Sequence, residues 1–147
     1  FWVYSLAVGG DDIYAGGIFI SAGGVSANRI AKWNTNTNTW SALGLGVDWF
    51  GGGAVNAIAV NNKNVYVGGL FTTAGGVSAN NIAVWNDSSA TWSALGSGIM
   101  GSGEQPEVLA LKLDGNGKLY VGGKFTSAGG KSSSNFAICK TSLFHSY

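Results

Sequence analysis

The chain has 147 residues, a net charge of +1, 46% hydrophobic residues and only 10% charged residues. A chain this apolar can bury a core, so it is not expected to be disordered. Its eight basic residues are scattered along the chain, which argues against nucleic-acid binding, and its apolar runs are far shorter than the roughly 20 residues needed to span a bilayer.

Four short apolar runs, separated by turn residues, account for most of the first third of the chain. They are Val3–Val8, Ile13–Phe19, Arg29–Trp33 and Thr39–Leu43. None is long enough for a typical helix, and clusters of Gly, Asn, Asp or Ser bound each run, so the pattern predicts β-strands. Both alternating sets of residues in the first run include apolar side chains, and we therefore expect this strand to be covered on both faces.

The same pattern of runs returns in the middle of the chain. The second set is Val55–Val60, Val65–Phe71, Asn81–Trp85 and Thr91–Leu95. Phe19, Phe71 and Phe125 recur at spacings of 52 and 54 residues, a period typical of propeller blades or other repeat arrays. The sequence thus predicts an all-β fold of four-stranded antiparallel propeller blades.

The repeat divides the chain into two complete blades and a partial third. Residues 1–52 form blade 1, residues 53–105 blade 2 and residues 106–147 the partial blade 3, together one partial propeller domain. After Cys139 the third copy has no recognisable fourth strand, although Leu143 and Phe144 could form an edge strand.

A pair of glycines stands inside each second strand, where glycine normally weakens pairing. The pairs are Gly16-Gly17, Gly68-Gly69 and Gly122-Gly123. We expect them to admit a bulky ring from a neighbouring strand or blade, with Trp33, Trp40, Trp85 and Trp92 as the candidates. The alternative is a β-bulge without any special packing partner.

The blade pattern itself resembles a known repeat. "YVGG.FT.AGG", then "NNIA.WN", a variable turn and "TWSALG.G", resembles the kelch-like repeats of galactose-oxidase-type propellers and of the cell-polarity cortical marker family. The resemblance implies a four-stranded blade. A strict kelch repeat has its glycine pair before a separate Tyr and Trp, whereas Tyr14, Tyr66 and Tyr120 precede the pair here, so no functional residues are carried over.

Two blades and part of a third cannot close a ring, because propellers usually have four to eight blades. Phe1, Trp2, Leu143 and Phe144 place hydrophobic side chains at both ends of the chain. We therefore expect a homo-oligomer, most simply a dimer of about six blades. The alternative is a piece of a longer propeller that is completed by its remaining blades.

The sequence offers little for catalysis, and we expect neither an enzyme nor a bound cofactor or metal. His145 is the only histidine and lies in the tail, while Cys139 takes the place of Trp33 and Trp85 and should be structural. Glu104 and Glu107 are close in sequence, but they are better explained as an exposed loop pair than as a catalytic dyad.

Binding residues are expected at the end of the blades where the loops after the second and fourth strands converge. The candidates are Asn28, Arg29, Trp49, Phe50, Asn80, Asn81 and Asn135. Exposed aromatic rings beside amide groups suit a glycan, which offers apolar faces and hydroxyl groups. The competing interpretation is that the asparagines bond to nearby backbone, and that Trp49 and Phe50 fill an interface with an adjacent blade.

Two functions are consistent with these features. The first is a non-enzymatic interaction or assembly scaffold, located outside the cell or on its surface, where low charge and abundant Ser, Thr and Asn are common. The second is a lectin-like propeller with one shallow carbohydrate site per blade.

Overall fold

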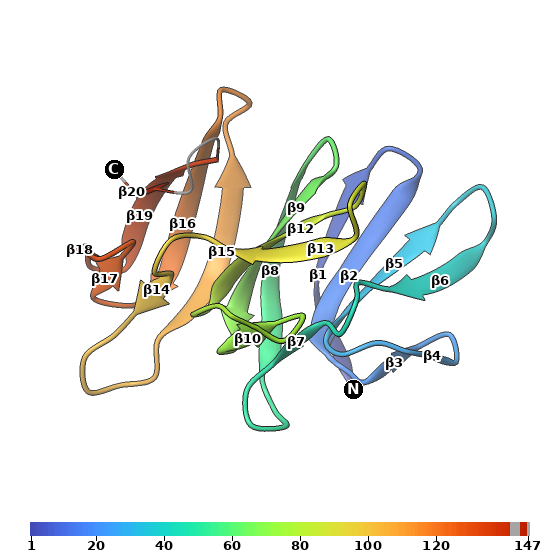
Figure 1. The fold of residues 1–147 in the computed structure, drawn as a ribbon, viewed down its shortest axis with the longest axis horizontal. Coiled ribbons are helices and arrows are strands. Elements are labelled where there is room, and N and C mark those ends of the chain that lie inside the picture. The colour runs from blue at the N-terminus through green and yellow to red at the C-terminus, as the bar shows by residue number, and fades with distance from the viewer. Residues whose placement is uncertain (142–144, 147) are drawn as a thin grey trace.

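The computed structural model describes residues 1–141 and 145–146. Three four-stranded antiparallel sheets stand side by side along the molecule (Figure 1). The described regular structure is entirely β, which confirms the predicted fold class, and it contains no helix that could cross a membrane.

Each large sheet is one blade with its strands in chain order. Blade 1 consists of β1 (Trp2–Gly9), β2 (Asp12–Ile18), β5 (Ile30–Asn34) and β6 (Thr39–Ala42). Blade 2 consists of β8 (Ala54–Asn61), β9 (Asn64–Leu70), β12 (Ile82–Asn86) and β13 (Thr91–Ala94). Blade 3 consists of β15 (Glu107–Leu113), β16 (Lys118–Lys124), β19 (Phe136–Lys140) and β20 (His145–Ser146).

Blade 3 has a fourth strand that the sequence did not reveal. Cys139 pairs with Ser146 and Lys140 with His145, so β20 closes the sheet beside β19. The Trp and Gly residues that mark this strand in the other blades are missing, but pairing needs only backbone N–H and C=O groups. The edge strand considered at Leu143 and Phe144 lies outside the described residues.

Short strands tie each blade to the next. In blade 1, β3 (Ser21–Ala22) and β4 (Val25–Ser26) form a small hairpin between β2 and β5. The matching hairpins are β10 (Thr73–Ala74) with β11 (Val77–Ser78), and β17 (Ser127–Ala128) with β18 (Lys131–Ser132). The connection leaving blade 1 adds β7 (Val47–Asp48) to the hairpin of blade 2, and that leaving blade 2 adds β14 (Ile99–Met100) to the hairpin of blade 3. Consecutive blades therefore share backbone hydrogen bonds as well as side-chain contacts.

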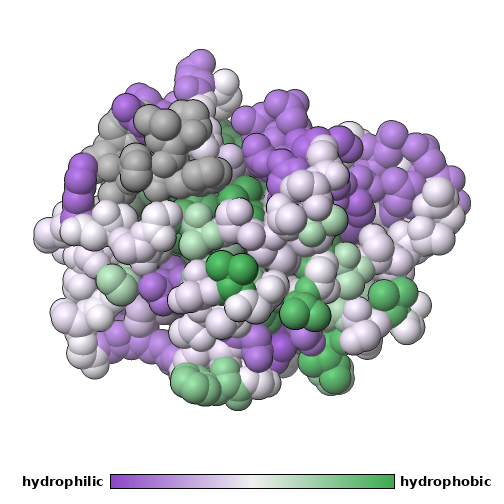
Figure 2. Space-filling model, viewed as in Figure 1, coloured by the Kyte–Doolittle hydropathy of each residue, from purple (hydrophilic) through white to green (hydrophobic). Residues whose placement is uncertain are grey.

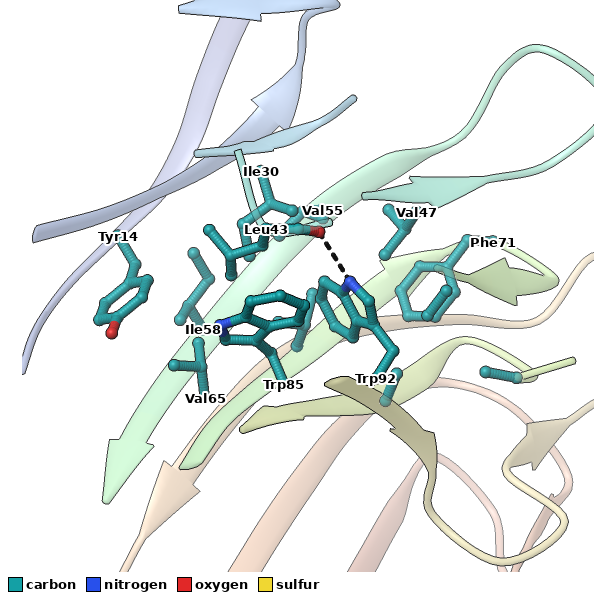
Figure 3. Packing of buried hydrophobic residues seen from close by; sticks show 14 residues of the cluster. Tyr14, Ile30, Leu43, Val47, Val55, Ile58, Val65, Phe71, Trp85 and Trp92 are labelled. Atoms are coloured by element: carbon teal, nitrogen blue, oxygen red, sulfur yellow. Dashed lines mark hydrogen bonds between the residues drawn. The ribbon is translucent and has the colours of Figure 1, made fainter. Parts of the chain in front are cut away.

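The hydrophobic core lies between the blades. One buried cluster joins blade 1 to blade 2 and includes Tyr14, Val55 and Trp92, and a second joins blade 2 to blade 3. Figure 3 shows the first cluster, in which the indole nitrogen of Trp92 donates a 2.7 Å hydrogen bond to the carbonyl oxygen of Leu43 in blade 1. The expectation that the first run, Val3–Val8, is covered on both faces was wrong, because Val3, Leu6 and Val8 of β1 are exposed. The equivalent strand β8 lies between two blades, with Val55 and Ile58 buried on one face and Ala57 and Ala59 on the other.

The glycine pairs admit aliphatic side chains and backbone rather than tryptophan rings, so the expected partners were wrong. A Cβ at Gly16 would lie 2.2 Å from Cγ1 of Val55 in the next blade, and one at Gly68 would lie 2.4 Å from Cγ1 of Val108. The second glycine faces a β-bulge, because a Cβ at Gly17 would lie 2.0 Å from the carbonyl oxygen of Trp2, where the pairing of β1 shifts.

The tryptophan rings cover other glycines instead. A Cβ at Gly23 would lie 2.2 Å from Cδ1 of Trp40, and one at Gly75 would lie 2.4 Å from Cδ1 of Trp92. Both glycines have positive φ and belong to the small hairpin of the same blade. The glycine pairs do need space, but aliphatic side chains and backbone fill it. The tryptophan rings cover glycines elsewhere, including Gly44 of blade 1, where a Cβ would lie 3.2 Å from Cζ3 of Trp85 in blade 2.

Candidate interaction surfaces

The predicted binding asparagines hold the loops of the blades together. Arg29, Asn81 and Asn135 occupy equivalent positions, and each has a φ of 63°. Asn81 is buried, and its Oδ1 accepts a hydrogen bond from the backbone N–H of Phe71 while its Nδ2 donates to the carbonyl oxygen of Ile99. Asn135 Oδ1 likewise accepts from the N–H of Phe125. The amide of Asn81 is thus engaged inside the fold, whereas Asn135 makes the equivalent hydrogen bond but is exposed.

Asn28 and Asn80 connect the loop after the second strand to the loop after the fourth. The Nδ2 of Asn28 donates to the carbonyl oxygen of Leu45, and that of Asn80 donates to Ser97, each over 3.1 Å. A donor that already bonds to the backbone is less available to a ligand. The geometry thus favours the loop-stabilising interpretation of the two asparagines, and sugar binding by them stays a prediction.

Arg29 positions the aromatic loop of blade 1. Its side chain is buried, its Nη2 donates a 2.9 Å hydrogen bond to the carbonyl oxygen of Gly51, and its Nη1 lies 3.5 Å from Oδ1 of Asp48. Trp49 and Phe50, between these two partners, form an edge-to-face pair with ring centroids 6.1 Å apart. The guanidinium therefore fixes both sides of the segment that carries the rings.

The structure brings only some of the predicted ligand-binding residues together. Trp49, Asn80 and Asn81 line a cavity of about 230 Å³ with Met100 and Pro106. Phe50 is outside this cavity and is 95% exposed. Asn28 and Asn135 belong to the loops of other blades and do not line it.

Some of the exposed apolar side chains lie on the outer face of a blade. Figure 2 shows the hydrophobic residues of one view in separate small groups, with a hydrophilic region over the hairpin of β5 and β6. On β1, the side chains of Val3, Leu6 and Val8 are 57%, 66% and 71% exposed, and we call them the blade 1 row. Their counterparts in β8 are Val55, Ile58 and Val60, which pack against blade 1.

The far side of blade 3 also carries exposed apolar side chains. Gly122, Tyr120 and Phe136 lie on the face turned away from blade 2, and with Ala110 we call them the blade 3 socket. The rings of Tyr120 and Phe136 stack with centroids 6.3 Å apart, and Phe136 is 54% exposed. Apolar residues at the chain ends were predicted, whereas these two surfaces were not. The first strands of the three repeats share this row of aliphatic residues, and aligning them would have located the two surfaces.

One ion pair crosses the interface of blades 1 and 2. The Nζ of Lys32 lies 2.9 Å from the carboxylate of Asp87 in blade 2 and 3.7 Å from that of Asp12. Burial alone would raise the pKa of Asp87, but hydrogen bonds from Trp85 and Lys32 outweigh burial and hold the pKa below its ordinary value. Burial and the nearby carboxylates of Asp87 and Asp12 raise the pKa of Tyr14.

The other acidic and thiol groups occupy separate places. Glu104 pairs with Lys124, whereas Glu107 faces the amide of Asn56, so the two carboxylates have different partners. Cys139 is buried, and burial raises the pKa of its thiol. In the described part of the chain, His, Cys, Asp and Glu residues form no group of three or more that could hold a metal ion.

The chain is similar to one family of β-propeller domains. The family model described as the Rax2 C-terminal beta propeller domain matches residues 48–142. The polarized growth protein rax2 of Schizosaccharomyces pombe is 28% identical over an alignment of 111 residues, which covers 64% of this chain and 9% of that protein. The chain thus corresponds to a small fraction of the length of this relative.

Two solved structures share the fold. The extracellular domain of the putative one component system BT4673 from B. thetaiotaomicron superposes with a TM-score of 0.57 and 16% identity, over 92% of this chain and 14% of that one. The computationally designed Ika4 protein superposes with a TM-score of 0.55 and 16% identity, over 94% of this chain and 65% of that one. At such identities the likeness concerns the fold alone.

Proposed function

The chain belongs to the Rax2 C-terminal β-propeller domain family, and from this premise we propose that it is a non-enzymatic assembly scaffold that binds other blades through its two terminal blade faces. The relative it matches is named a polarized growth protein, and a scaffold role outside the cell or at its surface suits such a protein. The observation that carries the proposal is the blade 1 row, because its side chains are exposed although their counterparts in blade 2 are buried or partly buried.

The arrangement of polar groups supports a role without catalysis. The carboxylates of Asp87 and Glu104 are paired with lysines, and that of Glu107 faces an amide. The asparagines of the loops bond to backbone groups. A rigid frame with apolar edges is typical of an assembly unit, because exposed apolar area of this kind marks contact surfaces.

Sedimentation velocity tests the proposal. We expect the chain to associate over concentrations from about 1 to 100 μM, and we expect Leu6→Lys to weaken the association at least tenfold, because a charge would be buried in the contact. Leu45→Lys is the matched control, since Leu45 is 71% exposed in a loop away from the row. Equal effects of the two substitutions, or a chain that stays monomeric, would contradict the proposal.

Carbohydrate binding is a second candidate function, favoured by the cavity that places Trp49 beside Asn80. A sugar ring could stack on the indole of Trp49 while its hydroxyl groups bond to amide oxygens. Calorimetric titration with a panel of simple glycans tests this function. Binding that is lost in both Trp49→Ala and Asn80→Ala would support it, and heat changes indistinguishable from buffer would count against it.

A further inference from the structure

The chain builds the same interface twice. At the first, Val55 and Ile58 of β8 lie over Gly16 of β2, and a Cβ at Gly16 would be 2.2 Å and 3.0 Å from the nearest atoms of these two side chains. At the second, Val108 and Leu111 of β15 lie over Gly68 of β9, and the matching distances are 2.4 Å and 3.3 Å. In both, aliphatic side chains of one blade fill the space above a bare glycine of the preceding blade.

The blade 1 row supplies the aliphatic half of this interface, but no glycine face lies against it. By strand register Val3 is equivalent to Val55, because each pairs with the second glycine of its blade. Leu6 is likewise equivalent to Ile58. Val3 and Leu6 are 57% and 66% exposed, whereas Val55 and Ile58 are 0% and 7% exposed.

The blade 3 socket supplies the glycine half of this interface without the aliphatic half. Among the described residues, a Cβ at Gly122 would meet only the Cβ of Ala110, at 3.8 Å. Phe136 pairs with Gly122 as Ile30 pairs with Gly16, yet Phe136 is exposed and Ile30 is fully buried. The space that a valine occupies above Gly16 and Gly68 is therefore open above Gly122.

We propose that the blade 1 row of one copy of this chain binds the blade 3 socket of a second copy, with Val3 over Gly122 and Leu6 beside it. The inference rests on the proposed scaffold function and deepens it by naming the partner. The contact is heterologous, joining unlike surfaces, and such contacts close into a ring when the rotations add to a full turn. Two copies using it twice would form a ring of about six blades, within the usual range for propellers.

The chemistry of both surfaces fits a second copy. The two surfaces are the separate halves of an interface that the chain already forms between its own blades, so each presents the shape that the other accepts. Phe136 stands where blades 1 and 2 have Ile30 and Ile82, and is also apolar. Lys112 is the polar difference, because it stands where they have Ala7 and Ala59. Its aliphatic stem can lie along the contact while the ammonium group reaches solvent.

Complementation between two variants tests the pairing. Leu6→Lys disables the row and leaves the socket intact, and Gly122→Val fills the socket and leaves the row intact. We expect the wild-type chain to sediment as a dimer of about twice its 15.0 kDa mass, and each variant alone to dimerise at least tenfold more weakly. An equimolar mixture should form more dimer than either variant alone, because the intact row of Gly122→Val can bind the intact socket of Leu6→Lys. This mixed dimer should still be weaker than the wild-type dimer, because its second contact joins the two altered surfaces.

The outcomes separate this inference from the proposed function. If the wild type associates and Leu6→Lys disrupts it, but Gly122→Val still dimerises or the mixture fails to recover, the row binds another surface and the inference alone is wrong. A wild type that stays monomeric contradicts both. Thermal unfolding of Gly122→Val at low concentration confirms that the variant folds, which is expected because the added side chain enters open space.

Discussion

Replacing the first glycine of a pair by alanine should have opposite effects in blade 1 and in blade 3. Gly16 and Gly122 are equivalent in strand register, and neither has a positive φ, so alanine fits the backbone at both positions. They differ in what lies above them. At Gly16 the new Cβ would lie 2.2 Å from Cγ1 and 2.9 Å from Cβ of Val55, and at Gly122 it would lie 3.8 Å from Ala110.

The magnitude follows from this difference. Ordinary contact begins at 3.4 Å, so Val55 and its blade would have to withdraw by about 1.2 Å in Gly16→Ala. Valine is stiff at χ1 and cannot turn aside easily. Overpacking of this kind costs about 1–3 kcal/mol, whereas alanine in open space stabilises by about 0.4–1 kcal/mol because it restricts the unfolded chain. We therefore expect the two variants to differ in free energy of unfolding by about 1.4–4 kcal/mol.

Urea denaturation at a concentration below the onset of self-association measures this difference. Gly16→Ala should unfold at lower urea than the wild type, and Gly122→Ala at the same or higher urea, with unchanged slopes. Gly68→Ala should resemble Gly16→Ala, since its Cβ would lie 2.4 Å from Val108. Equal destabilisation by all three substitutions would refute the view that the face above Gly122 is open in the monomer.

Three further substitutions or reactions test other contacts. Asp87→Asn should make stability depend less on pH in the acid range. Folding lowers the pKa of Asp87, so the stability that its carboxylate contributes is complete above the unfolded pKa of about 3.8 and is lost as pH falls through the folded pKa. Urea denaturation of both proteins from pH 5 to pH 2 measures this loss. Asn81→Ala should destabilise the fold by about 2–4 kcal/mol, because it removes two hydrogen bonds to backbone groups and places alanine at a φ of 63°. Asn81→Gly should cost less, because glycine tolerates that φ. Equal losses in thermal unfolding would show that the positive φ contributes nothing to the cost. Cys139 should react with a thiol reagent far more slowly in the native protein than in denaturant, because it is 7% exposed and burial raises its pKa; similar rates in absorbance assays would show that the site opens readily.

The strands could be predicted from the sequence because their signals are local. Alternation, run length and turn residues place β2 and β9 within one or two residues of the observed ends, and the repeat period gives the blades. The partners of the glycine pairs could not be predicted in the same way. The residue above Gly16 comes from the next blade, about 40 residues later in the chain, so no local pattern identifies it.

The short fourth strand of blade 3 was missed for a related reason. Its sequence lost the tryptophan and glycine that mark β6 and β13, but the backbone of His145 and Ser146 still pairs with β19. The asparagines of the loops illustrate the opposite error, in which a local pattern suggests a surface role. Asn81 is polar and lies in a loop, yet its amide is consumed by the hydrogen bonds that shape that loop.

The valine-over-glycine contact also bears on how such arrays change in number during evolution. Because every unit carries the protruding element on one side and the matching gap on the other, a tandem duplication of one unit inserts a member that already fits both of its neighbours. The agreement of residues 71–85 with residues 19–33 at eleven of fifteen positions is consistent with growth of this kind. Gain or loss of whole blades would then require no new pair of complementary surfaces. It would require only a ring that can close with a different number of blades.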